Sequence, residues 1–115
     1  MTAQQSVVDA PELPEAEDNV VYISRLSDPT PALVHGYPDA KTGDVIKIAA
    51  YTSTLNFFEE KKVLTTPVFP VQFGIPKSIF AENLEAGAQA KLHFTVTNAA
   101  GNVIVSSPLK VSIER

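Results

Sequence analysis

The sequence predicts an all-β domain, a Greek-key β-sandwich of about seven strands with one short helical turn. Two observations favour this class. From Asn19 onward, apolar residues recur mostly at every second position, which is the spacing of half-buried strands. Turn-forming residues separate these segments at short intervals. The chain of 115 residues fits one domain, large enough to remove about two thirds of its unfolded surface from water.

Residues 1–18 differ from the rest of the chain. They contain Pro11 and Pro14, four acidic residues between positions 12 and 18, and no sustained periodicity. We therefore expect an extended leader or linker at 1–18, followed by a sandwich domain at 19–115. The alternative is that its apolar residues dock on the domain as an edge strand; these are Val7, Val8 and Leu13.

Strands are expected at 19–26, at 32–35 and over DVIKIAAYTS at 44–53. The last of these alternates clearly between two faces. Its apolar face consists of Ile46, Ile48 and Ala50, and its other face of Val45, Lys47 and Tyr51.

Two further strands are expected at 53–58 and at 67–75, where Pro70 indicates an edge strand or a bulge. A helical turn follows over PKSIFAENL, with Pro76 favoured at the first helical position. The apolar residues of this turn are expected to cover one end of the core; they are Ile79, Phe80 and Leu84.

The C-terminal third is predicted to be a hairpin. AKLHFTVTN, at 90–98, alternates apolar Leu92, Phe94 and Val96 with polar residues that include His93. The NAAGN loop that follows contains residues that tolerate positive φ. A final alternating strand is expected at 109–114.

Three stretches together resemble the bacterial immunoglobulin-like repeats that occur in tandem in large proteobacterial surface or secreted proteins. They are APELPEAEDNV, YPDAKTGDVIKI and FGIPKSIFAENLEAGAQAKLHFTVTNAAGNVIVSSPLKVSI, which lie in the family's order and cover most of the chain. The resemblance implies an immunoglobulin-like sandwich with a binding or spacer role at a cell surface, and no single ligand.

The chain also departs from that family. It has no tryptophan and carries Ala50 and Tyr51 near the place where such repeats often have one. We expect phenylalanines to supply this packing; they are Phe57, Phe58, Phe69 and Phe73. Residues 53–67 resemble the family least, so the most individual surface is expected there.

Composition argues against several classes of function. The net charge of −4 comes from 9 basic and 13 acidic residues scattered along the chain, with no basic stripe, so we expect no nucleic-acid partner. No stretch has the roughly 18 apolar residues of a membrane span, and no secretory signal is recognisable, so membrane insertion is not expected. The absence of cysteine excludes disulfides and thiolate chemistry.

The sequence offers no catalytic signature. The five glycines are dispersed, and no serine nucleophile can be matched to a base, so we expect no enzymatic activity and no cofactor. His35 and His93 are interpreted as structural or solvated residues, with metal binding as the alternative. Asp39 and Asp44, in HGYPDAKTGD, are interpreted as turn residues rather than calcium ligands.

The predicted partner contact is FFEEKK, which is Phe57, Phe58, Glu59, Glu60, Lys61 and Lys62. Adjacent phenylalanines in a strand point to opposite faces, which would leave one of them exposed among charges, at a hairpin tip or sheet edge. The alternative is a bulge that buries both rings.

The predicted function is therefore a non-catalytic adhesive or spacer module of a bacterial surface or secreted protein, located outside the cell. Its expected partners are a protein or glycan surface and neighbouring immunoglobulin-like repeats. The alternative is a stand-alone small secreted effector, toxin or lectin-like protein that binds a host or competitor cell surface.

Overall fold

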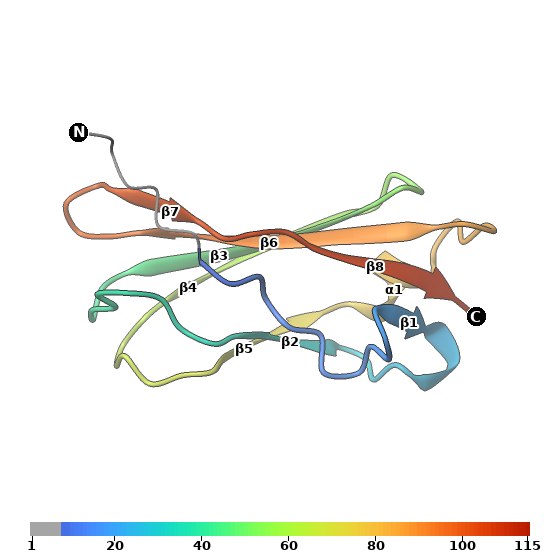
Figure 1. Cartoon of the computed structure of the whole chain (residues 1–115), viewed down its shortest axis with the longest axis horizontal. Coiled ribbons are helices and arrows are strands. Elements are labelled where there is room, and N and C mark those ends of the chain that lie inside the picture. Colours follow the sequence, from blue (N-terminus) through green and yellow to red (C-terminus); the bar gives the residue numbers. More distant parts are fainter. Residues whose placement is uncertain (1–7) are drawn as a thin grey trace.

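The structure is a computed structural model that describes residues 8–115. It is mostly β, and its strands form two sheets that lie in two layers (Figure 1). The larger sheet has six strands in the order β1-β8-β6-β3-β4, with β7 paired to β6, and the smaller sheet contains β2 and β5. The strands are β1 Val20–Tyr22, β2 Thr30–Val34, β3 Val45–Thr52, β4 Phe57–Val63, β5 Val71–Ile75, β6 Gln89–Thr97, β7 Val103–Val105 and β8 Leu109–Glu114.

The hydrophobic core lies between the two sheets, because the alternating strands turn their apolar faces inward. The prediction for β3 and β6 is confirmed: every residue assigned to their apolar faces is buried. The smaller sheet contributes four buried apolar residues, Ala32, Val34, Phe73 and Ile75. Phe57, by contrast, is 54% exposed, so the expectation that it packs in the core is wrong.

Helix α1, Lys77–Ala81, lies between β5 and β6 and buries Phe80 completely. Pro76 is its N-cap rather than its first residue, and the Lys77 N–H donates to a carboxylate oxygen of Asp28. Ile79 and Leu84 pack against the core while remaining partly exposed. The expected helical turn is therefore present and does cover part of the core.

Three predicted strands are shorter or shifted, and the one expected at 67–75 begins only at Val71. The chain leaves the larger sheet after Tyr22, and a 3-10 turn over Ile23–Arg25 brings Leu26 into the core. Residues 53–56 form a turn instead of a strand, because the Asn56 side chain donates to the carbonyl oxygens of Ile79 and Glu82. This polar anchoring outweighs the apolar character of Leu55, which is 93% exposed.

The C-terminal hairpin is present, but its return strand is interrupted. β7 pairs with the end of β6 and β8 with its beginning, and their registers on β6 differ by one residue. At this bulge Ser106 is buried: its N–H donates to the Phe94 carbonyl oxygen, and its Oγ accepts the Phe94 N–H at 2.9 Å.

The described part of the leader packs on the domain. Val8 and Leu13 are both buried members of the core. The Val8 carbonyl accepts the Ser107 N–H, and Glu12 exchanges two backbone hydrogen bonds with Leu33 of β2. Residues 8–13 therefore dock on the domain, as the alternative interpretation of this segment proposed. Val7 lies outside the described residues.

Candidate binding site on the outer sheet face

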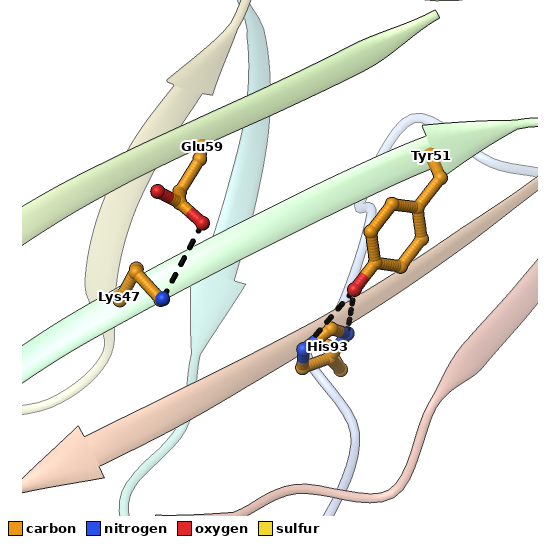
Figure 2. Close-up of polar contacts among 4 residues, drawn as sticks. All are labelled: Lys47, Tyr51, Glu59 and His93. Carbon is orange, nitrogen blue, oxygen red and sulfur yellow. Dashed lines mark hydrogen bonds and ion pairs between the residues drawn. The ribbon is translucent and has the colours of Figure 1, made fainter. Parts of the chain in front are cut away.

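The outer face of the larger sheet carries three neighbouring rings, Tyr51 of β3, Phe57 of β4 and His93 of β6, which we call the aromatic platform. Strand pairing assembles it: Tyr51 lies opposite Phe57, and His93 lies opposite Ala49, two residues before Tyr51. In Figure 2 the side chains of Tyr51 and His93 stand on the face of the sheet that is turned away from β2 and β5. The platform is therefore built by three adjacent strands and points to solvent.

The platform rings are close to parallel. The ring centroids of Tyr51 and Phe57 are 5.4 Å apart with planes inclined by 29°, and those of Tyr51 and His93 are 5.5 Å apart with planes inclined by 31°. Phe57 is 54% exposed and Tyr51 38%. Ala49 points to the same face, yet it is only 3% exposed, so side chains around it lie across it. The result is a partly exposed cluster of offset, near-parallel rings.

Polar groups border the platform at fixed positions. The Tyr51 hydroxyl lies 3.3 Å from Nδ1 and 3.5 Å from Nε2 of His93 (Figure 2). The Lys47 ammonium pairs with the Glu59 carboxylate at 3.3 Å. On the far side of Tyr51, an open hollow of about 410 Å³ is lined in part by Lys91 and Lys110. Donors and acceptors thus flank the rings on both sides.

The pKa of His93 lies below its ordinary value. Burial is the main cause, and the positive charges of Lys47 and Lys91 add to it, while Glu59 acts in the opposite direction. At neutral pH the imidazole is therefore uncharged and keeps both a hydrogen-bond donor and an acceptor nitrogen.

The sheet divides the predicted FFEEKK contact between two faces. Phe57, Glu59 and Lys61 share the outer face with the platform, which follows from the period of two. Their neighbours point the other way: Phe58 packs against the core, and the Lys62 ammonium bonds the Gln72 carbonyl and lies 5.0 Å from the centre of the Phe73 ring. Residues 59–62 lie within an edge strand, not at a hairpin tip.

The HGYPDAKTGD segment is a turn organised by Asp44, which is 3% exposed. One carboxylate oxygen of Asp44 accepts the Tyr37 hydroxyl at 2.9 Å and the Lys41 N–H at 3.0 Å. Burial and this hydrogen bond raise the pKa of Tyr37 above its ordinary value. Gly43 adopts a φ of +97°, and Asp39 one of +62°. The turn reading of this segment agrees with each of these contacts.

The two histidines are held apart by the fold. His35 follows β2 of the smaller sheet and pairs with Glu12, whereas His93 belongs to the larger sheet and contacts Tyr51. Within residues 8–115, no three side chains of the metal-binding types gather at one place. The sequence predicted Phe57 as a contact residue. It did not predict that Phe57 lies beside Tyr51 and His93, because that arrangement depends on strand register.

Comparisons of this chain with protein-family models, with curated proteins and with solved structures find no match. In the part of the chain that the structure describes, no helix has the length and apolar character needed to cross a membrane.

Proposed function

We propose that this chain is a non-catalytic, immunoglobulin-like adhesive module of a bacterial surface or secreted protein, and that it binds carbohydrate through the aromatic platform. The observation that carries the proposal is the set of near-parallel rings of Tyr51, Phe57 and His93 on the solvent face of the sheet.

The strand order supports the immunoglobulin-like part of the proposal. In that fold the second and fifth strands pair in one sheet, and the third, sixth and seventh pair in the other. Here β2 pairs with β5, and β3, β6 and β8 are neighbours in the larger sheet. The chain passes between the sheets after β1, β2, β4 and β5. β4 corresponds to the additional strand found beside the third strand in variable-type domains.

The chemistry of the platform favours a carbohydrate. An aromatic face carries partial negative charge, and a pyranose ring presents C–H groups with partial positive charge on its apolar side. The hydroxyl groups at the rim of the sugar need both donors and acceptors. Lys47, Glu59 and neutral His93 offer these beside the rings. An open, exposed surface suits a polysaccharide chain better than a small enclosed ligand.

A glycan array followed by calorimetric titration of the glycans it identifies tests this proposal. We expect Phe57→Ala and Tyr51→Ala each to weaken binding by roughly tenfold or more, as loss of an aromatic contact usually does. Val103→Ala is the matched control, because Val103 is an apolar residue on the same sheet, 59% exposed, on β7 away from the platform. Wild-type affinity in both platform variants would contradict the assignment of the site.

Binding to whole cells separates the ligand from the module. If cells bind the chain and glycosidase treatment abolishes binding, the carbohydrate part is supported. If binding survives that treatment but is lost in Phe57→Ala, the adhesive module is retained and its partner is a protein. Absence of binding to both arrays and cells would contradict the adhesive function.

A spacer role is the second candidate, and the docked leader favours it. Val8 and Leu13 are buried, and backbone bonds fix residues 8 and 12 against Ser107 and Leu33. A leader held in this way sets the direction in which the chain approaches the domain, which is what a rigid spacer requires.

A further inference from the structure

We propose that a second copy of this chain pairs with strand β4, antiparallel and edge to edge, so that the larger sheet continues from one copy into the other. The proposal rests on the free edge of β4 and on the charge pattern along it, and it does not depend on the carbohydrate ligand.

The outer edge of β4 offers a row of unpaired backbone groups. Within residues 8–115, β3 is the strand that pairs with β4, and nothing pairs with its other edge. Backbone hydrogen bonds at both ends of β4 show which of its residues bond β3. Leu64 donates to the Asp44 carbonyl, and the Asn56 carbonyl accepts the Thr52 N–H. Even-numbered residues of β4 therefore bond β3.

The odd-numbered residues of β4 consequently turn their N–H and C=O groups away from β3. These residues are Phe57, Glu59, Lys61 and Val63, and all four side chains are exposed on the outer face. An edge of this kind pairs readily with another strand unless repulsion prevents it.

The charge pattern selects one register. Two identical antiparallel strands are related by a twofold axis normal to the sheet, so residues on the same face lie opposite one another. If the axis passes beside Glu59, or beside Lys61, that residue faces its own copy and two like charges lie directly opposite one another. If the axis passes beside Glu60, Glu59 lies opposite Lys61 of the second copy and Phe57 lies opposite Val63. Each of these pairs occurs twice because of the symmetry. Both kinds of pair stabilise adjacent antiparallel strands.

The inner face limits the strength of this dimer. In the selected register Glu60 lies opposite Glu60 of the second copy, and Lys62 is the diagonal neighbour that offsets part of the repulsion. Because a single edge buries little area, self-association should be weak.

The dimer would place both outer faces on the same side of one continuous sheet. Phe57 of one copy and Phe57 of the other would then lie roughly 20 Å apart along the strand direction, from a rise of about 3.3 Å per residue. If the proposed carbohydrate site is correct, a polysaccharide could contact both aromatic platforms, and avidity would follow.

Sedimentation equilibrium of the full chain at low ionic strength tests the proposal, over concentrations up to about 1 mM. We expect Glu59→Lys and Lys61→Glu each to weaken the dimer by about tenfold or more, because each places like charges opposite at two symmetric positions. Glu60→Gln should tighten it severalfold. Lys91→Glu is the control, because Lys91 is an exposed lysine of β6 that lies away from the edge.

A mixture of the two weakened variants is the decisive measurement. Glu59→Lys in one copy and Lys61→Glu in the other restore opposite charges at every pair, so an equimolar mixture should form a heterodimer with near wild-type affinity. The double variant should dimerise for the same reason. A monomeric wild type at about 1 mM would overturn the proposal. So would a folded pair of variants, checked by circular dichroism, that fails to associate on mixing.

Discussion

Replacement of Asp44 by alanine should remove the support of the turn that leads into β3. The carboxylate is 3% exposed and accepts hydrogen bonds from the Tyr37 hydroxyl and the Lys41 N–H. A hydrogen bond to a charged group contributes about 1.5–3 kcal/mol, and water can partly replace these partners in the half-exposed turn. We therefore expect Asp44→Ala to lower the free energy of unfolding by about 2–4 kcal/mol.

Urea denaturation measures this loss, provided that the slope of the transition is unchanged. Tyr37→Phe is the matched variant, because it deletes only the hydroxyl and keeps the edge-to-face contact with Phe69, whose ring centroid is 5.5 Å away. It should cost about 1–2 kcal/mol, and the two changes together should cost less than their sum. A loss below about 1 kcal/mol for Asp44→Ala would show that these two hydrogen bonds do not support the turn.

Two further predictions concern the leader and the platform. Leu13→Ala should lower the free energy of unfolding by about 2–5 kcal/mol, because Leu13 is 4% exposed in the core, whereas exposed Pro14→Ala should change it little; equal, small effects would show that the leader does not stabilise the domain. The NMR titration midpoint of His93, measured in a His35→Gln variant, should fall below 6.5 because burial and nearby lysines disfavour its charged form. The unfolded chain then binds this proton more readily, so the His93 contribution to stability decreases as pH falls from about 6.5 towards the lower folded pKa; a midpoint at or above 6.5 would contradict this.

The strands that could be predicted most closely are those whose pattern is local and long. β3 and β6 alternate over eight and nine residues, and each side chain assigned to their inner faces is buried. The loop between β6 and β7 is likewise stabilised by contacts within a few residues. Asn98 Oδ1 accepts hydrogen bonds from the N–H groups of Ala100 and Asn102, and Gly101 has a φ of +86°.

The predictions that differ from the structure concern segments whose conformation depends on a contact with a distant part of the chain. The turn at 53–56 depends on hydrogen bonds from Asn56 to carbonyls of the Ile79–Glu82 region, more than twenty positions away. The docking of the leader depends on a space in the core that Val8 and Leu13 fill. Neither partner can be found from the local sequence alone.

Local sequence patterns were enough to predict that this protein is built of alternating strands, with a polar turn before β3; they left open whether one ring of FFEEKK is exposed. These features follow from backbone periodicity and turn chemistry, which act over a few residues. The tertiary structure was needed to show that Tyr51, Phe57 and His93 share one surface and that Glu59 and Lys61 lie on β4, whose outer edge pairs with no strand within residues 8–115. Strand order and register join residues far apart in the chain, and packing of the whole sheet selects them.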